Sequence, residues 1–583
     1  MDKGKKIAED EKLSLKNCFD SNDILFNYQT DATNKQKKEA ADRLNSTFTG
    51  EMALVYDFGK ICPYKNPNCD LEKEGLSLKP EIENIMAKSR DYDELTYVWT
   101  AWRDATGAKM KKLYKALVDK SNENARASSI PCVLYYLVYY RAVIVQISSD
   151  TGEMWRAFYK DANFIENMEN IWMQIKPLYT ELYKYVGRKL KMFYRNRLDI
   201  SDGLVPAQVF GSVWAQSWTN IADIVLPFPK ASKMNIEAGL KERNFTTLDM
   251  FKIADEFYQS VGLLPMGNAY NESIGAVFNK PKDGRKVVCH PSTADYCNGT
   301  IKVKMCIQLN FEDLMSVFHE LGHAQYGLQY LQTQPSSYRD SPTPGFHEAI
   351  GTTLALSFMS PTHLQRIGLL NNFLDSYEAN INVLLYMALN KVAFLPFGLL
   401  VDKWRWDVFN GSVPENKWNS HYWQYKKIYQ RLKPPVERSD ETDLDPGDMY
   451  NIPVNIDFIM YYYAGILEFQ IFKSMCIEAD KYDPLTKKMP LHKCDFYNVA
   501  KAGGKLSKGM QLGSSKNWTE VLEIMTGYNT ISVDPLLEYF EPLYRFLKEE
   551  NKEFEEFIRE LIEPRIKIPD ISILLFTLDD SNE

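Results

Sequence analysis

Apolar residues recur every three or four positions along most of this chain, and polar or charged residues fill the positions between them. Between residues 81 and 120, Trp99, Trp102 and Leu113 follow this spacing among charged side chains, which is typical of amphipathic helices. Residues 213–218 (Val-Trp-Ala-Gln-Ser-Trp) are predicted to lie in another apolar helix. The same spacing predicts further helices over residues 165–196, 247–263, 311–332, 346–359, 361–402, 455–480 and 534–562.

Runs that alternate apolar and polar residues, as strands do, are few and short, with examples at residues 286–289 and 301–303. We find no internal repeat, no low-complexity tract and no obvious linker. The pattern therefore predicts one large, mostly all-α domain over residues 49–562. A polar, charge-rich segment (1–48) precedes it, and a tail (563–583) too short for a membrane anchor follows it.

Residues 129–148 form an atypical stretch that is almost wholly apolar. Its length is borderline for a membrane-spanning helix and it contains Arg141, so a buried helix or strand pair is favoured and no membrane span is predicted. The first residues lack the apolar run of a signal peptide. Either a signal has been removed, or the amino terminus is incomplete, or the protein stays in the cytosol.

The composition narrows the class of protein. Of 583 residues, 45% are hydrophobic and 25% are charged, as in soluble globular proteins with a large core. The net charge of −8 and the isoelectric point near 5.7 argue against a nucleic-acid partner, because such partners bind basic surfaces.

The nine cysteines are too few for a disulfide-dense miniprotein. Six of them flank short loops, as expected of an extracellular protein: Cys62 and Cys69, Cys289 and Cys306, and Cys476 and Cys494. Cys18, Cys132 and Cys297 would remain. These spacings favour an extracellular or secreted location.

The motif His319-Glu320-Leu321-Gly322-His323 lies inside one of the predicted helices. Residues four apart share a helix face, so His319 and His323 can hold one metal ion together. Glu320, one position on, can reach a water on that ion and take its proton. This arrangement is typical of zinc hydrolases. The alternative is two histidines on a helix face without a metal.

A catalytic zinc site needs a third protein ligand. Glu348 follows His323 by 25 residues, which is enough for one helix to end, a loop to turn and another helix to begin. Pro344 and Gly345 suit that second helix start. Glu348 is therefore the predicted third ligand.

At these motifs and well beyond them, the chain resembles the angiotensin-converting enzyme family of zinc peptidyl-dipeptidases, which are gluzincin metallopeptidases. The likeness runs from about residue 50 to about residue 547, omitting the apolar insert near 129–148. The matching stretches, in chain order, are residues 214–218, 287–290, 319–326, 344–351, 394–397, 404–406 and 434–436.

The resemblance implies a nearly all-helical ellipsoid with a deep central substrate channel, zinc at the channel floor and a few short strands near the zinc site. Amino-terminal helices form a lid in that family, and residues 1–48 would be a shortened, weakly matching lid region. The family's disulfides coincide with Cys62–Cys69, Cys289–Cys306 and Cys476–Cys494. Its members are secreted or membrane-anchored ectoenzymes.

The resemblance also implies roles for single residues. His319, His323 and Glu348 would hold one Zn²⁺ per chain, with Glu320 as general base and Tyr461 as donor to the oxyanion. The substrate-binding positions would be His290, Gln216, Asn451 and Phe394.

Several matching positions carry a different residue from the family. Asn451 replaces a transition-state histidine, and Thr352 replaces an acidic residue that orients a zinc histidine. Met449 and Phe458 replace the lysine and tyrosine that anchor the substrate carboxylate, at a cost of about 1.5–3 and about 1 kcal/mol. Gly465 replaces an aromatic residue in the pocket for the last side chain. Met460 and Lys426 replace two arginines that bind chloride, so chloride binding is doubtful.

Three hypotheses about function follow. The first is a zinc peptidase that removes dipeptides from the carboxyl end of short peptides, with weakened recognition of the terminal carboxylate and reduced activity. The second is a catalytically impaired relative that binds a peptide or a partner. The third, suggested by the missing signal, is an intracellular helical oligopeptidase. The physiological substrate and the oligomeric state are not predicted.

Overall fold

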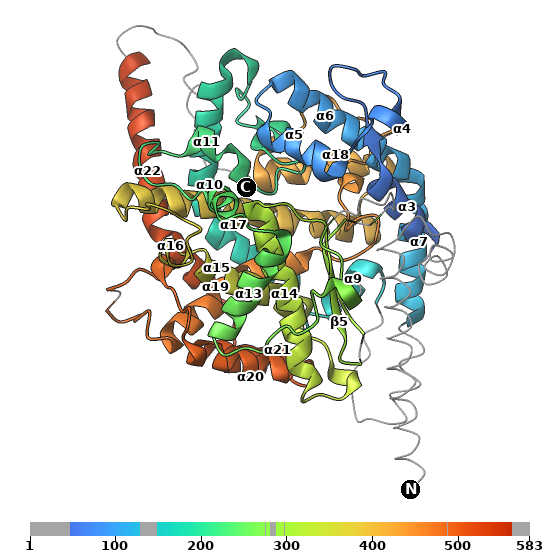
Figure 1. Cartoon of the computed structure of the whole chain (residues 1–583). Coiled ribbons are helices and arrows are strands. Elements are labelled where there is room, and N and C mark those ends of the chain that lie inside the picture. Colours follow the sequence, from blue (N-terminus) through green and yellow to red (C-terminus); the bar gives the residue numbers. More distant parts are fainter. Residues whose placement is uncertain are drawn as a thin grey trace.

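The computed structural model describes residues 47–128, 148–274, 276–279, 287, 289–296, 298–486 and 488–562. Helices dominate this part of the chain, and its strands have two to four residues each (Figure 1). The prediction of a mostly all-α fold is therefore confirmed. Parts of the prediction lie wholly or almost wholly outside the described residues: the segments 1–48 and 563–583, the apolar stretch near 129–148, and Cys18, Cys132 and Cys297.

The first half of the described chain contains α3 (Thr47–Phe58), α4 (Leu71–Glu74), α5 (Glu83–Lys88), α6 (Tyr92–Ala105), α7 (Gly107–Ser128), α9 (Thr151–Ala157), α10 (Phe164–Tyr194), α11 (Ala222–Val225), α12 (Ile236–Glu242) and α13 (Thr247–Ser260). The second half contains α14 (Phe311–Leu331), α15 (Pro344–Phe358), α16 (Pro361–Arg366), α17 (Tyr377–Phe409), α18 (Trp418–Tyr425), α19 (Ile459–Glu478), α20 (Gly504–Gln511), α21 (Trp518–Thr526) and α22 (Asp534–Ile562). Short 3₁₀ and π turns join several of them.

The strands form three two-stranded sheets. Their bounds are β1 (Lys60–Ile61), β2 (Leu76–Ser77), β3 (Val205–Pro206), β4 (Ser292–Asp295), β5 (Ile301–Lys304) and β6 (Leu432–Lys433). β4 and β5 pair antiparallel, with Ser292 opposite Lys304 and Asp295 opposite Ile301. This hairpin packs against α14, and residues 301–303 lie in it as predicted.

Two of the predicted helical regions each contain more than one helix. The single helix predicted over 361–402 is α16 followed by α17, because Gly368 adopts a left-handed φ of 71° and Ser376 caps a new helix by accepting the Ala379 N–H. The helical region from 81 to 120 is α5, α6 and α7, with Asp91 capping α6. Asp and Ser side chains favour such starts because they bond free N–H groups at a helix end.

The helix predicted over residues 213–218 is wrong. The segment is irregular, and Ala215 has a φ of 54°, which a right-handed helix cannot contain. Two of its backbone carbonyls accept hydrogen bonds from side chains, where a helix would use the backbone N–H groups of its next turn. Lys426 Nζ donates to Trp214 O and Gln430 Nε2 donates to Ala215 O, each over 3.1 Å.

α14, α15 and α19 form the centre of the molecule, with α15 packed against both of the others (Figure 1). Glycines make these crossings close. A Cβ on Gly322 would lie 2.4 Å from the Gly351 nitrogen, and one on Gly345 would lie 2.3 Å from the Tyr463 ring. No side chain fits at such distances, so glycine is required where α15 meets α14 and α19. This packing brings together the two sequence motifs that were predicted to bind a metal ion.

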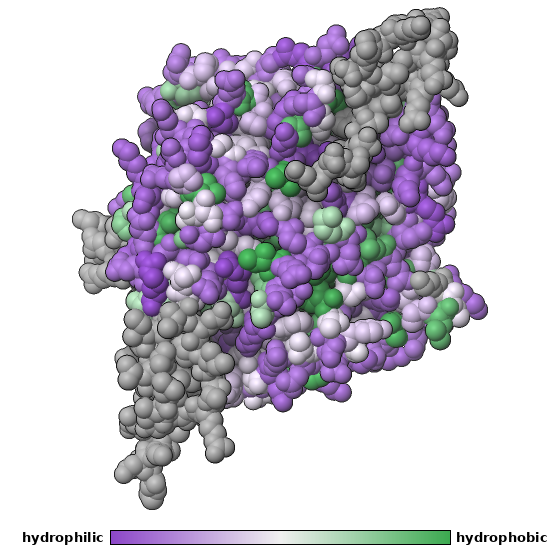
Figure 2. Space-filling view, turned by 180° about the vertical axis from the view of Figure 1, so that it is seen from behind, coloured by the Kyte–Doolittle hydropathy of each residue, from purple (hydrophilic) through white to green (hydrophobic). Residues whose placement is uncertain are grey.

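One helix in the described part of the chain, α17, is long and apolar enough to cross a membrane by length and composition. However, 78% of its most apolar window is buried inside the molecule, as expected of a central core helix. On the face shown in Figure 2, hydrophilic residues dominate and hydrophobic residues form small separate groups, which is normal for a protein surface.

Within the described part of the chain, three disulfides join Cys62 to Cys69, Cys289 to Cys306, and Cys476 to Cys494. These are the pairs that the resemblance implied. They are compatible with an oxidising, extracellular environment.

Candidate metal centre and substrate channel

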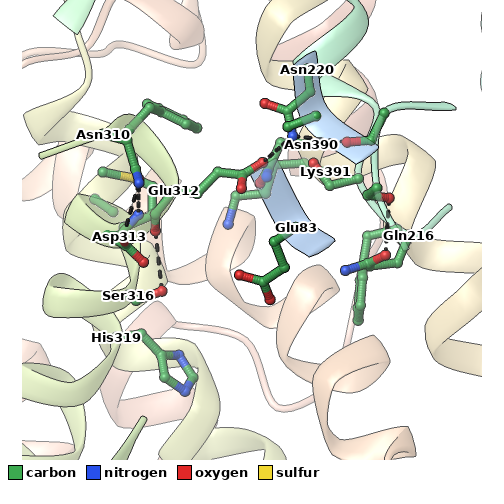
Figure 3. A pocket seen from close by; sticks show the side chains of 18 of the residues that line it. Glu83, Gln216, Asn220, Asn310, Glu312, Asp313, Ser316, His319, Asn390 and Lys391 are labelled. Carbon is green, nitrogen blue, oxygen red and sulfur yellow. Dashed lines mark hydrogen bonds between the residues drawn. The ribbon is translucent and has the colours of Figure 1, made fainter. Parts of the chain in front are cut away.

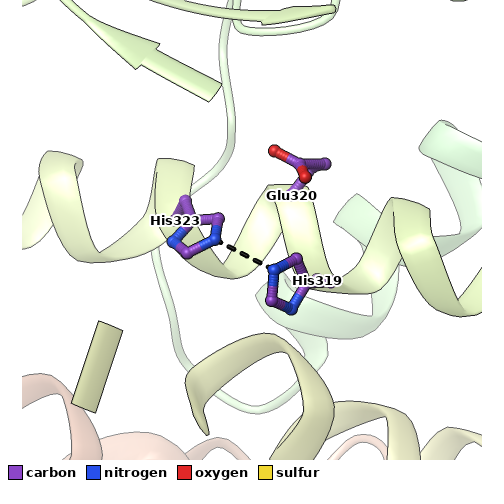
Figure 4. A group of neighbouring side chains, drawn as sticks. All are labelled: His319, Glu320 and His323. Carbon is purple, nitrogen blue, oxygen red and sulfur yellow. Dashed lines mark hydrogen bonds between the residues drawn. The ribbon is translucent and has the colours of Figure 1, made fainter. Parts of the chain in front are cut away.

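α14 presents the two motif histidines on one face. The helix begins where Asn310 Oδ1 accepts the Asp313 N–H over 2.7 Å, and buried residues such as Phe318 and Leu321 fix it in the core. His319 and His323 face each other across one turn, with their Nε2 atoms 3.1 Å apart (Figure 4). The spacing of four residues thus places both imidazoles as predicted.

The carboxylate of Glu348, from α15, completes this group. Its Oε2 lies 3.0 Å from His319 Nε2 and 3.5 Å from His323 Nε2. Ligands of a tetrahedral zinc ion at about 2.0–2.1 Å stand roughly 3.3 Å apart. The three donor atoms therefore have the separations that one zinc ion requires.

The chemistry of the group also fits a zinc ion. Two imidazole nitrogens and one carboxylate oxygen are a common donor set of catalytic zinc. Glu348 Oε2 is buried, and its nearest polar neighbours among the described residues are the Nε2 atoms of His319 and His323. A metal ion placed among the three atoms would satisfy all of them.

A different triad also clusters on α14 alone. Donor atoms of His319, Glu320 and His323 lie within 4.8 Å of one another. We favour Glu348 over Glu320 as third ligand, because Glu348 is closer to both imidazoles and the Glu320 carboxylate is engaged elsewhere.

The charges of the group depend on one another. Burial would raise the pKa of Glu348, but His323 and His319 hold that pKa well below its usual range. Burial would lower the pKa of His323, but the Glu348 carboxylate raises it to about 9. Without an ion, the carboxylate thus favours a proton on the imidazole, in the place where a metal ion would bind.

Glu320 is buried and oriented by a residue that the sequence analysis missed. Thr293 Oγ1, from β4, lies 2.6 Å from Glu320 Oε2 and 3.0 Å from Glu320 O. The hydroxyl can donate to the carboxylate and restrict its rotation. Thr293 lies 27 residues from Glu320 in the chain, and no motif pointed to it.

His347 is a second contact that sequence reasoning missed. Its Nδ1 lies 2.7 Å from Nδ1 of His323. Burial and the neighbouring His323 lower the pKa of His347 to about 3, so its ring is neutral and can accept the His323 N–H. Such partners fix the orientation of metal-binding imidazoles.

Thr352 does not orient a histidine. It lies one turn after Glu348, and its hydroxyl lies 3.4 Å from Glu348 O and 3.1 Å from Ala349 O, both in its own helix. An aspartate there could accept an imidazole N–H.

We expect Thr352→Asp to tighten zinc binding by about 10-fold, the lower end of typical effects from such partners. Competition with a fluorescent chelator measures the zinc dissociation constant, and Thr352→Asn is the uncharged control of equal size. Equal zinc affinities of the two variants would mean that residue 352 does not act on the candidate ligands His319, His323 and Glu348, which we call the metal group.

Two cavities meet at the metal group. One has a volume of about 830 Å³ and the other about 700 Å³. Ser316, His319, Glu348 and Tyr461 line both. The metal group therefore lies in the wall shared by both cavities, as expected for a site at the floor of a substrate channel.

The 700 Å³ cavity contains most of the predicted catalytic partners, including His290, Asn451 and Glu320. His290 stacks on Tyr450 with ring centroids 3.8 Å apart. Burial raises the pKa of Tyr461 well above its usual value, and a side-chain hydrogen bond from Asn451 opposes that shift. Tyr461 is thus a protonated phenol, able to donate a hydrogen bond beside the metal group.

The 830 Å³ cavity contains Gln216 and Phe394. Gln216 Oε1 accepts from Ser212 over 3.1 Å, and its amide nitrogen points into the cavity (Figure 3). Met449 and Phe458 line neither cavity, and Phe458 packs on Tyr461 with ring centroids 5.0 Å apart. Of the implied carboxylate-anchor positions, Gln216 alone among the described residues reaches this space.

Comparison with known proteins agrees with this geometry. A sequence model described as angiotensin-converting enzyme matches residues 11–558. The chain belongs to the angiotensin-converting enzyme family. This family is zinc-dependent, in keeping with the donor set formed by α14 and α15.

Individual relatives differ in length. The chain is 39% identical to angiotensin-converting enzyme of Mus musculus over 509 residues, which are 87% of this chain and 36% of that protein. It is 37% identical to the enzyme of Haematobia irritans exigua over 500 residues, which are 85% of this chain and 77% of that protein. It is also 37% identical to the enzyme of Theromyzon tessulatum over 499 residues, or 85% and 76%. The chain thus spans about a third of the mouse enzyme and about three quarters of the other two.

Proposed function

We propose that this protein is a zinc metallopeptidase that removes dipeptides from the carboxyl end of short peptides. The observation that carries the proposal is the convergence of His319, His323 and Glu348 in the wall between two cavities, with Glu320 beside them. A zinc ion bound there would act as a Lewis acid and ease the deprotonation of water at neutral pH.

The chain's own residues divide the remaining work. Glu320, held by Thr293, takes the proton from the attacking water and returns it to the leaving amine. Tyr461 donates to the oxygen that becomes negative as the carbonyl is attacked. Asn451 contacts Tyr461 and can donate one hydrogen bond, without the positive charge of a histidine.

The substrate would extend along both cavities. Its carboxyl end would lie in the 830 Å³ cavity beside Gln216 and Phe394, and its backbone near the scissile bond would contact His290. A zinc peptidase with three disulfides suits an extracellular or secreted location.

The test is hydrolysis of an amino-terminally blocked tripeptide by purified protein, with and without a chelator and then with added zinc. We expect release of the carboxyl-terminal dipeptide, its loss with the chelator and its recovery with zinc. Stoichiometric zinc without turnover would favour the second candidate, a peptide- or partner-binding protein, for which Met449, Asn451 and Phe458 provide the support.

Weakened recognition of the terminal carboxylate gives a separate prediction. Amidating the carboxyl end of a substrate is expected to raise its KM by less than the roughly 10-fold that a charge-assisted clamp provides. Steady-state kinetics on a matched free and amidated peptide pair measure this ratio. A larger increase would mean that another cation in the 830 Å³ cavity, such as Lys79 or Lys391, binds the carboxylate.

A further inference from the structure

Asp448 is a buried carboxylate that the proposed reaction does not use. Its side chain is 1% exposed, and its Oδ2 lies 2.8 Å from Nη2 of Arg103, whose side chain is 5% exposed. Burial raises the pKa of Asp448 to about 7, against the opposing effects of Arg103 and of Lys426, which is 2% exposed. None of these three residues lines either cavity, so any effect on the reaction must pass through other residues.

The three charged residues touch the segment that carries Gln216. Arg103 Nη2 donates to Val213 O over 3.1 Å, and Lys426 Nζ donates to Trp214 O over 3.1 Å. Trp214 Nε1 in turn donates to the backbone oxygen of Asp448 over 3.1 Å. These bonds hold a segment whose backbone is irregular, with Ala215 at a φ of 54°.

The same residues also adjoin a loop that lines the 700 Å³ cavity. Asp448 ends a 3₁₀ turn (Asp445–Asp448), and Tyr450 and Asn451 follow two and three residues later. Tyr450 stacks on His290, and Asn451 contacts Tyr461. Asp448 therefore joins the loop with Asn451 to the segment with Gln216.

Arg103 is the permanent charge that the Asp448 carboxylate balances. Arg103 stays protonated at neutral pH, and its guanidinium is buried over the Trp99 ring at 3.7 Å. Burial holds the pKa of Lys426 well below its usual range, while Asp448 raises it. Removing one partner of a buried pair leaves an uncompensated charge, which is strongly destabilising.

We propose that Asp448 is a positioning residue whose carboxylate acts as an internal counter-ion for Arg103 and Lys426, and so holds the Asn451 loop against the Gln216 segment. The inference rests on the proposed function for its kinetic consequence. Its structural consequence does not depend on any catalytic activity.

Chemical rescue tests this proposal. Asp448→Ala empties the counter-ion position, so the zinc-loaded variant should melt several degrees lower and show kcat reduced about 10- to 100-fold, as misplaced side chains near a reacting centre cause. Formate or chloride, added as sodium salts, should raise both the melting temperature and kcat in a saturable way. Wild-type protein should respond to neither anion beyond general salt effects.

Glu538→Ala is the matched control. It removes a carboxylate from an ion pair between α19 and α22, where Lys473 Nζ lies 2.7 Å from Glu538 Oε2. This variant should keep wild-type kcat and show no response to formate. Rescue of melting temperature without rescue of kcat, measured well below the melting temperature, would overturn the positioning role. Wild-type kcat in the Asp448→Ala variant would overturn it as well.

Two further measurements keep the test valid if the wild-type protein is inactive or if Asp448→Ala does not fold. If wild-type protein hydrolyses nothing, the dissociation constant of the blocked tripeptide replaces kcat as the readout, so a failed proposed function does not hide this result. If Asp448→Ala does not fold, a double-mutant cycle of Asp448→Asn and Lys426→Met gives the coupling between the two positions. Additive changes in that cycle would refute the counter-ion assignment.

Discussion

Replacing Glu320 with glutamine is expected to lower kcat by about 10²- to 10⁴-fold while zinc content stays near one ion per chain. Glutamine keeps the size of the side chain, but its amide cannot accept the proton of the attacking water. The metal group should persist, because His319, His323 and Glu348 supply the donors without Glu320.

Single-turnover hydrolysis of the blocked tripeptide and elemental analysis of zinc measure the two parts of this expectation. Glu520→Gln, at an exposed position of α21, is the control for the substitution itself and should behave as wild type. Undiminished hydrolysis by the Glu320 variant would remove Glu320 from the mechanism.

The local part of the site follows from the sequence because it depends on helix geometry alone. His319 and His323 are one turn apart in any helix, so their shared face was predictable. Glu348 was predictable at a coarser level, since Pro344 marks a helix start that the structure contains. Its distance from the histidines depends on the close crossing at Gly322 and Gly351, which no local pattern specifies.

The residues that support the site were not predictable in this way. Thr293 and His347 reach Glu320 and His323 over 27 and 24 positions of sequence, through packing of separate elements. The error at residues 213–218 has the same origin. Apolar spacing favoured a helix there, but side chains of Lys426 and Gln430, more than 200 positions away, bond the carbonyls that a helix would use.

The positions that differ from the family can be ranked by their expected effect on substrate binding and turnover. Met449 and Phe458 lie outside both cavities. They therefore affect substrate binding because they lack the ammonium and hydroxyl groups of the family's lysine and tyrosine, and not through contacts of their own. Asn451 lies in the 700 Å³ cavity and contacts Tyr461. The substitution with the most direct bearing on turnover is therefore Asn451, since it adjoins Tyr461, the proposed donor to the oxyanion.

Glu348→Gln is expected to weaken zinc binding by more than about 100-fold and to abolish hydrolysis at stoichiometric zinc. Loss of a residue that merely orients a zinc ligand costs about 10- to 100-fold, and Glu348 is a ligand itself in the proposed site. The neutral amide also loses the attraction between the carboxylate and the metal ion. Equilibrium dialysis against a zinc buffer measures the affinity, and the blocked tripeptide measures turnover.

The comparison with Glu320→Gln makes this result decisive. Both residues have a carboxylate near the two histidines, but Glu348 Oε2 lies 3.0 Å from His319 Nε2, whereas the Glu320 carboxylate bonds Thr293. Only Glu348→Gln should therefore lose zinc, and excess zinc should restore part of its activity. If Glu320→Gln lost zinc and Glu348→Gln retained it, the third ligand would come from α14 itself, and Glu348 would have to be reassigned to orienting the histidines.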